Sequence, residues 1–338
     1  MTRLSYISAE SFDHSDIGCD RVHRPYKSAM LASDTWATRY HETVARNRLQ
    51  WQTKTVLLLV FPAIGADIVL ETRWWMTHTP RVAIWTLGLS TLLGLVAYKL
   101  RSATAGAALA GMAITATMMF ATAGFPYLPW KTALLPILTV LLLTSLATRV
   151  GHKHKENLGT AESRTGREAS QVAANLGIAA LVSNPLIQIW LINHGWVYTR
   201  GILPNPAPAL ALGLAALAEA AADTVSSELG QVLSGHPRMI TTFRKAEPGT
   251  DGAISLGGTA MGIIAAASVA AAGSWAFGGG TPIFLVSWAG AVFGLFFDSI
   301  LGATLERRGW INNDAVNFLS TASAAAVALS LLAVQRSQ

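Results

Sequence analysis

The chain has 338 residues, of which 51% are hydrophobic and 13% are charged, and its mean hydropathy is +0.40. This composition excludes a soluble globular protein as the leading class and predicts an all-α, polytopic integral membrane protein. The one cysteine, Cys19, excludes a disulfide scaffold and a cysteine-ligated metal cluster. A net charge of +6 would suggest a nucleic-acid partner in a soluble protein. In a membrane chain the positions of the charges matter more, and we expect no nucleic-acid partner.

Residues 1–54 are polar and mixed in charge, and they contain no apolar run long enough to cross a bilayer. They also lack the apolar core of a cleavable signal peptide. We interpret them as a cytoplasmic N-terminal arm or as short helices on the membrane surface. The transmembrane domain is predicted to comprise residues 55–338, with its chemistry-bearing motifs concentrated in 149–321.

Nine apolar stretches are long enough to cross a bilayer whose apolar core is about 30 Å thick. They are 55–71, 82–98, 103–123, 132–148, 172–192, 205–222, 253–275, 282–304 and 315–334. Cytoplasmic loops carry an excess of Lys and Arg. With nine spans and the N-terminus inside, 20 of the 25 Lys and Arg residues lie on the cytoplasmic side and five on the other. We therefore expect about nine transmembrane helices in the bacterial inner membrane, with a cytoplasmic N-terminus.

The end of the sixth stretch carries two carboxylates one helical turn apart, Glu219 and Asp223, among alanine residues. Thr224, Ser227 and Glu228 follow them. Carboxylates beside small residues leave room for a cation or a phosphate group near the backbone, so this segment is a candidate metal site. The alternative is structural, with an Asp that caps the helix and a Glu held in a salt bridge.

A glycine-rich segment, Gly249 to Thr259, precedes the seventh stretch. A glycine turn that opens a helix presents free backbone N–H groups and the positive end of the helix dipole, and both favour an anion. Gly249, Thr250, Gly252 and Ser255 are therefore candidate phosphate-binding residues. The alternative is an ordinary turn followed by a pair of closely packed glycines.

Two further polar pairs lie near the cytoplasmic ends of the last two stretches. Asp298 and Ser299 stand in an apolar run, where an ionisable side chain is costly and is a candidate for function. Asn313 and Asn317 lie one helical turn apart at the start of the ninth stretch.

The loop between the fourth and fifth stretches is basic. Arg149, Lys153 and Arg167 are candidates for binding phosphate groups, Arg through paired hydrogen bonds and Lys as a point charge. Gln171 and Asn175, one turn apart, are placed to orient a ligand at the start of the fifth stretch. The alternative is a plain positively charged loop on the cytoplasmic side.

All of these elements fall on the cytoplasmic side of the predicted topology. Carboxylates for Mg²⁺, a glycine turn for phosphate and a group of cations match the needs of phosphoryl transfer, which depends on positioning and charge neutralisation. The sequence contains no Walker loop, nucleophile elbow or HExxH motif. Because the site opens among apolar spans, we expect an acceptor that is soluble in membrane lipid.

The motif-bearing segments are, in chain order, GREASQVAANLG (166–177), EAAADTVSSELGQ (219–231), PGTDGAISLGGT (248–259), FDSILGAT (297–304) and NNDAVNFLST (312–321). Together they resemble the membrane family that contains plant phytyl-phosphate kinase and animal transmembrane protein nineteen. Most of its bacterial members were long labelled domain of unknown function ninety-two. The resemblance covers roughly 80–334. It implies a kinase that uses Mg²⁺ and CTP, or a related nucleotide, to convert phytyl or another prenyl monophosphate into the diphosphate.

The resemblance places the family's motifs on particular residues of this chain, and we assign roles to them as hypotheses. Asp223, Glu228 and Asp298 are assigned to catalysis and, with Glu219, to Mg²⁺. The residues assigned to the substrate and nucleotide phosphates are Arg149, Lys153, Arg167, Gln171, Asn175, Thr224, Ser227, Gly249, Thr250, Gly252, Ser255, Ser299, Asn313 and Asn317. Many relatives carry Thr-Lys where this chain has Thr148-Arg149, so the positive charge is kept but a role specific to lysine is not.

Two other functions fit parts of the pattern. A lipid or isoprenoid transporter or flippase would also have many spans and small-residue helices, but its charged residues should lie near the membrane midplane. A CTP-dependent cytidylyltransferase would need the same Mg²⁺ and phosphate groups. A kinase releases CDP, whereas a cytidylyltransferase releases pyrophosphate.

Overall fold

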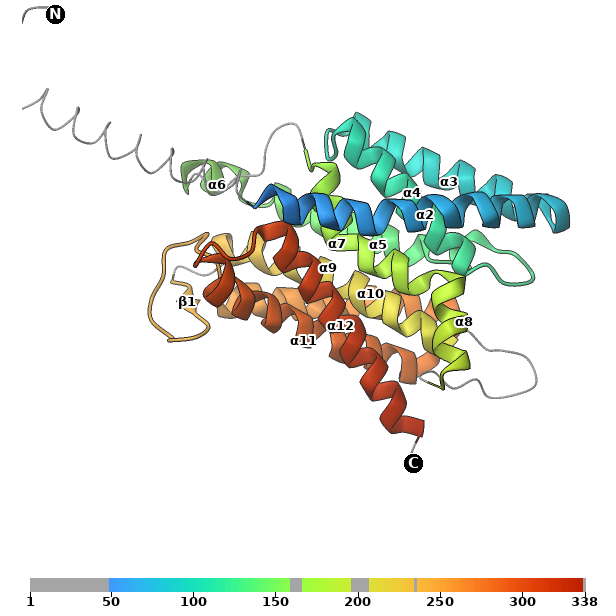
Figure 1. The fold of residues 1–338 in the computed structure, drawn as a ribbon. Coiled ribbons are helices and arrows are strands. Elements are labelled where there is room, and N and C mark those ends of the chain that lie inside the picture. The colour runs from blue at the N-terminus through green and yellow to red at the C-terminus, as the bar shows by residue number, and fades with distance from the viewer. Residues whose placement is uncertain (1–48, 159–165, 196–206, 234–235, 337–338) are drawn as a thin grey trace, which may run out of the picture. The chain divides into compact units, whose positions relative to one another are not determined.

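The computed structural model describes residues 49–158, 166–195, 207–233 and 236–336. The predicted arm therefore lies almost wholly outside the described residues. The described elements are helices α2 (Gln50–His78), α3 (Pro80–Lys99), α4 (Ala105–Ala121), η1 (Pro129–Lys131), α5 (Leu134–Arg149), α6 (His152–Leu158), α7 (Ala169–Ser183), α8 (Pro185–Asn193), α9 (Ala207–Leu233), α10 (Leu256–Phe277), α11 (Gly280–Leu301), the π-helix η2 (Gly302–Glu306) and α12 (Asn313–Arg336), with strands β1 (Arg238–Met239) and β2 (Ala253–Ile254) (Figure 1).

The described part of the chain is a polytopic helical membrane bundle, as predicted. Six helices are long and apolar enough to cross a membrane, namely α2, α3, α9, α10, α11 with η2, and α12. The number rises to eight if each of two bent pairs, α5 with α6 and α7 with α8, is one span. The predicted count of nine additionally needs α4, which forms where the third stretch was expected but has 17 residues, one turn short of a comfortable crossing.

The fifth predicted span is not one straight helix. It breaks between Ser183 and Pro185, and α7 and α8 meet at an angle of 55°. Proline lacks the N–H that would continue the backbone hydrogen bonds. Asn184 starts α8 instead, because its side chain accepts a hydrogen bond from the N–H of Leu186 at 2.9 Å.

Helix α9 is the centre of the bundle and contacts α5, α7, α10, α11 and α12. In the most apolar 18-residue stretch of α9, 89% of the residues are buried inside the protein, compared with 22% in the corresponding stretch of α2. Its alanine side chains allow neighbouring backbones to approach closely. Gly262 and Gly258 of α10 lie against backbone oxygens of α9, from Ala222 and Ser226. The sixth predicted stretch was expected to end near 222, whereas α9 continues to Leu233, so all of its polar residues are helical.

Strands β1 and β2 form a short antiparallel pair, the one sheet among the described residues and a departure from the all-α prediction. Arg238 pairs with Ile254 and Met239 with Ala253. The pair fixes the segment that enters α10 at one end of the bundle (Figure 1).

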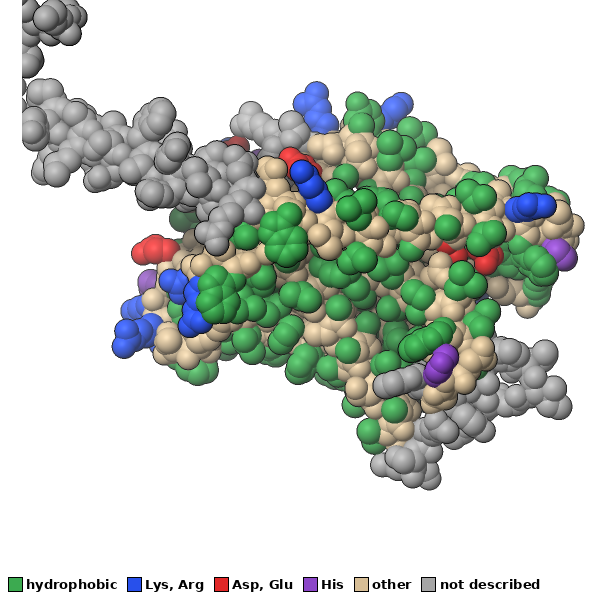
Figure 2. Space-filling model, viewed as in Figure 1, with side chains coloured by type: hydrophobic (Ala, Val, Ile, Leu, Met, Phe, Trp, Pro, Cys, Tyr) green, Lys and Arg blue, Asp and Glu red, His purple; other side chains and the backbone are tan. Residues whose placement is uncertain are grey.

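The outer surface of the bundle fits a bilayer. Figure 2 shows a flank covered mainly by hydrophobic and uncharged side chains, and basic side chains gather around the end that carries β1. Two carboxylates within α2 find partners inside the protein. Asp67 accepts a hydrogen bond from the side-chain amide of Asn184, and Glu71 accepts one from the indole of Trp75, both at 2.9 Å.

Candidate functional site

A polar cavity of about 210 Å³ lies where α9 and α11 end and α10 and α12 begin. It brings together residues that are far apart in the sequence but were all predicted site residues. Those that line it are Asp223, Ser227, Gly249, Thr250, Gly252, Ser255, Asp298, Ser299, Asn313 and Asn317. We call it the acidic cavity.

The glycine turn of the acidic cavity has the geometry that its sequence predicts. Gly249 and Gly252 both have positive φ, +82° and +72°, in the left-handed region that favours glycine. Ser255 caps α10, because its hydroxyl accepts a hydrogen bond from the N–H of Gly258 at 3.1 Å. The turn thus places the N-terminus of α10 at the cavity.

Carboxylates crowd the inner wall of the acidic cavity. The charges of Asp223 and Glu219 both act on Asp298, so the three groups are close enough to interact. Glu219 is 1% exposed. One carboxylate oxygen of Glu219 and one of Asp298 are buried without a hydrogen-bond partner. Buried polar atoms normally have a hydrogen-bond partner, and these two oxygens are therefore candidates to contact a bound ligand.

Two more acidic residues reach the same cavity. Glu306, at the end of η2, lines it, and the charge of Asp223 acts on Glu306. Asp251 lies in the glycine turn, and its side chain is exposed at the surface. Its carboxyl group is nevertheless partly buried, and this burial raises its pKa above the ordinary value. The charge of Arg307 acts in the opposite direction. Among the described residues, no three His, Cys, Asp or Glu side chains form a ready-made metal-binding group.

A second cavity of about 320 Å³ lies beside the end of α5 and the start of α7. Three arginines line it, Arg101, Arg149 and Arg167, and its walls also include hydroxyl and apolar side chains. The remaining residues that line this cavity are Leu100, Ser102, Leu141, Thr144, Ser145, Thr148, His152 and Gly166. We call it the basic cavity. The charge of its Arg167 acts on Asp223, which lines the acidic cavity, so the two cavities are linked electrostatically.

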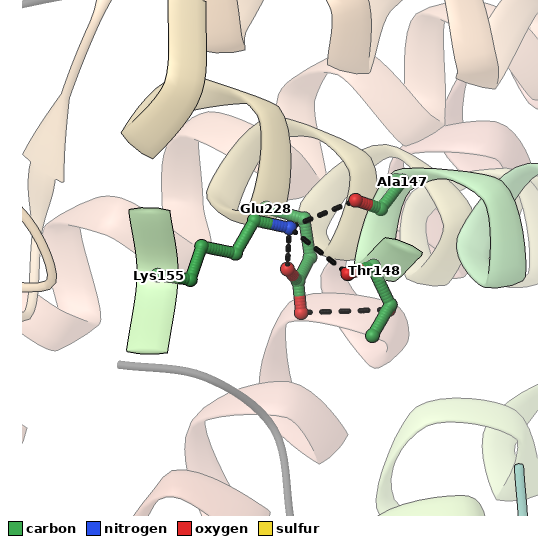
Figure 3. Close-up of polar contacts among 4 residues, drawn as sticks. All are labelled: Ala147, Thr148, Lys155 and Glu228. Atoms are coloured by element: carbon green, nitrogen blue, oxygen red, sulfur yellow. Dashed lines mark hydrogen bonds and ion pairs between the residues drawn. The ribbon is translucent and has the colours of Figure 1, made fainter. Parts of the chain in front are cut away.

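Several predicted residues line neither cavity. Glu228 forms an ion pair with Lys155 and accepts a hydrogen bond from Thr148 (Figure 3). Lys153 is exposed on α6, and Glu219 is buried behind the acidic cavity. Thr224 follows Asp223 on α9 and is half-buried.

Gln171 and Asn175 stabilise the first turns of α7 rather than line a cavity. The side chain of Gln171 accepts a hydrogen bond from the N–H of Glu168 at 2.8 Å as half of a capping box. The amide of Asn175 donates to the carbonyl oxygen of Gln171 at 2.9 Å. These bonds hold the segment that carries Arg167 at the edge of the basic cavity.

Sequence reasoning missed three residues with prominent places. Lys155 is buried although it stands in an otherwise exposed basic helix, and no pattern separated it from Lys153. Glu306 was placed beyond the eighth span, whereas η2 extends α11 and carries it into the acidic cavity. Arg101 was counted as a loop charge. It lines the basic cavity from a backbone with φ of +56°.

Residues 88–325 match the family described as integral membrane protein DUF92. The chain belongs to this family. The match includes all five motif-bearing segments, so the resemblance inferred from them is confirmed. Both cavities are lined by residues within the matched range.

Relatives of the family occur in archaea, cyanobacteria and plants. An uncharacterised membrane protein of Methanocaldococcus jannaschii is 34% identical over 211 residues, which cover 62% of this chain and 78% of the relative. An uncharacterised membrane protein of Synechocystis is 30% identical over 220 residues, covering 60% and 75%. The chloroplast protein VTE6 of Arabidopsis thaliana is 26% identical over 193 residues, covering 56% and 55%. No solved structure matches the chain significantly.

Proposed function

We propose that the protein is a membrane-embedded phosphotransferase that moves a phosphoryl group from a nucleoside triphosphate, CTP as first choice, to phytyl or another prenyl monophosphate. The observation that carries the proposal is the pair of cavities linked by the interaction of Arg167 with Asp223. One is acidic and opens on a glycine turn, and the other is lined by three arginines. A reaction between two phosphate compounds needs two such sites side by side.

The acidic cavity suits the nucleotide triphosphate and its metal. Mg²⁺ in phosphoryl-transfer sites is usually held by one or two carboxylates together with substrate phosphates and water, so a preformed three-ligand group is not required. Asp223 and Asp298 would hold it, and the unpartnered oxygen of Asp298 fits this role. Bound there, Mg²⁺ would neutralise charge on the transferred group. The N–H groups at the start of α10 would hold the phosphates.

The basic cavity suits the acceptor. Arg101, Arg149 and Arg167 would bind its phosphate group, because guanidinium groups form paired hydrogen bonds with phosphate oxygens. Leu100 and Leu141 offer apolar contact to a prenyl chain. Lys153, which is exposed on the neighbouring helix α6, would attract the anionic acceptor as it approaches.

The proposed reaction balances without a covalent enzyme intermediate. An oxygen of the prenyl phosphate attacks the γ-phosphorus of the nucleotide, and the bond from that phosphorus to the bridging oxygen breaks. The products are the prenyl diphosphate and the nucleoside diphosphate. Arg167 lines the basic cavity and its charge acts on Asp223 of the acidic cavity, so it would stabilise negative charge on the group in transfer.

The family relationship supports the same substrate class. The chain is distantly similar to the plant protein VTE6, and the resemblance of its motifs implies phytyl or another prenyl monophosphate as the substrate. We place the two cavities on the cytoplasmic side, because 20 of the 25 Lys and Arg residues fall on that side of the predicted topology. Nucleotides are supplied there, and the acceptor would enter from the lipid of the inner membrane.

A turnover assay tests the proposal. Detergent-purified protein is given phytyl, geranylgeranyl or farnesyl monophosphate with CTP or another nucleotide, with and without Mg²⁺. We expect Mg²⁺-dependent prenyl diphosphate and an equal amount of nucleoside diphosphate. Pyrophosphate in place of CDP would instead indicate a cytidylyltransferase. No product from folded, monodisperse protein would overturn the enzyme proposal and favour a lipid carrier, to be tested in liposomes.

A further inference from the structure

Lys155 is a buried lysine on the short helix α6. It is 1% exposed, and its ammonium group donates to the carbonyl oxygens of Ala147, at 2.8 Å, and Thr148, at 3.3 Å. It also forms an ion pair with the carboxylate of Glu228 on α9 (Figure 3). One side chain therefore ties together three helices, α5, α6 and α9.

The contacts of Lys155 close the C-terminal end of α5. The last carbonyl groups of a helix have no partner within it, and a cation at this end also interacts favourably with the helix dipole. The chain turns sharply here, since α5 and α6 are bent by 63° and Gly151 between them has φ of +66°. A side chain at Gly151 would collide with Val232 of α9. The turn is thus pressed against α9.

Residues beside the ion pair line both cavities. Thr148 and Arg149, at the end of α5, line the basic cavity, while Ser227 of α9 lines the acidic cavity. Glu228 follows Ser227 in the chain. Its second carboxylate oxygen accepts a hydrogen bond from the Thr148 hydroxyl at 3.5 Å. Lys155, Glu228 and Thr148 therefore connect the end of α5, which lines the basic cavity, to the part of α9 that lines the acidic cavity.

We propose that the Lys155–Glu228 pair is a positioning clamp that fixes the arginine-bearing end of α5 against α9, and so sets the acceptor phosphate relative to the nucleotide. The inference rests on the proposed function for its substrates, but the clamp itself is a statement about two helices. A buried ion pair costs desolvation that often equals its Coulomb gain, so replacing it by apolar side chains can leave stability unchanged. Its contribution would then lie in geometry rather than in stability.

A kinetic experiment separates a role of the ion pair in geometry from a role in stability. Two double variants are compared with the wild type. The apolar pair combines Lys155→Met and Glu228→Met, and the exchanged pair combines Lys155→Glu and Glu228→Lys. Lys54→Met, on the exposed start of α2, is the matched control. We expect the apolar pair to fold and to raise the KM for phytyl monophosphate about tenfold, while the KM for CTP changes less than about threefold. The exchanged pair should recover part of the loss.

The clamp can also be tested without turnover. In a Cys19→Ser background, spin labels are attached at Val150→Cys on the end of α5 and Leu233→Cys on the end of α9, both of which are exposed. We expect one narrow distance distribution with the native pair and a broad one with the apolar pair. An unchanged distribution would overturn the clamp. So would an equal rise of both KM values. An inactive wild type with a narrow distribution that broadens in the variant would overturn only the proposed function.

Discussion

Gly252 lies so close to Ala303 that a methyl group on Gly252 would overlap the backbone nitrogen of Ala303. The contact joins the glycine turn to η2, the π-helix that carries Glu306 into the acidic cavity. A π-turn inside a longer helix often marks a functional site. Here the turn and the π-helix determine each other's position.

Gly252→Ala should therefore weaken nucleotide binding. The change forces a left-handed conformation on alanine, at roughly 1–2 kcal/mol, and also displaces η2. We expect the KM for CTP to rise about tenfold or more. Gly278→Ala is the matched control, because Gly278 has φ of +67° but open space around it. It should lose similar stability and keep the KM. Equal effects of the two variants on the KM would contradict a specific role for the turn.

Asp223→Asn and Asp298→Asn should each lower turnover about 100-fold or more if these carboxylates hold Mg²⁺. Both side chains lie in a crowded group of like charges, and removing one charge relieves repulsion. The melting temperature should consequently stay equal or rise. Glu71→Gln, in α2 away from both cavities, is the control and should keep full activity. Full activity of both Asp variants, measured by CDP release, would refute the site.

Arg101→Gln and Arg149→Gln should impair use of the acceptor. Each removes a guanidinium group from the basic cavity, so we expect the KM for prenyl monophosphate to rise about tenfold while the KM for CTP is kept. Arg81→Gln, an exposed arginine at the start of α3, provides the comparison and should leave both values unchanged. A rise in the KM for CTP alone would show that the basic cavity binds the nucleotide instead.

The bond between Asn184 and Asp67 should matter for stability rather than for catalysis. Asp67→Ala leaves the buried amide of Asn184 without its acceptor, which costs about 1–3 kcal/mol. Asp67→Asn keeps an acceptor oxygen and should be closer to the wild type. Denaturation of the purified protein in detergent measures both. Equal stability of the wild type and Asp67→Ala would mean that the bond contributes nothing.

Much of this protein follows from its sequence alone. Long apolar stretches must become helices in a membrane, since each backbone group needs a partner within its own segment. The glycine turn and the Ser255 cap were also predictable, because positive φ and helix caps depend on neighbouring residues. Asp223, Asp298 and Asn317 come together because α9 and α11 end, and α12 begins, on the same side of the bundle, which the predicted topology already required.

Other features were decided only by the tertiary structure. Lys153 and Lys155 stand two residues apart in one basic helix, yet only Lys155 is buried. The difference arises because α6 packs against α9 and the end of α5. There the ammonium group of Lys155 meets a carboxylate of α9 and two carbonyl oxygens at the end of α5. For the same reason Glu228, a predicted metal ligand, pairs with a lysine. Local sequence specifies which segments are helical, but the partner of a buried charge is set by which helices meet, and that depends on packing along the whole chain.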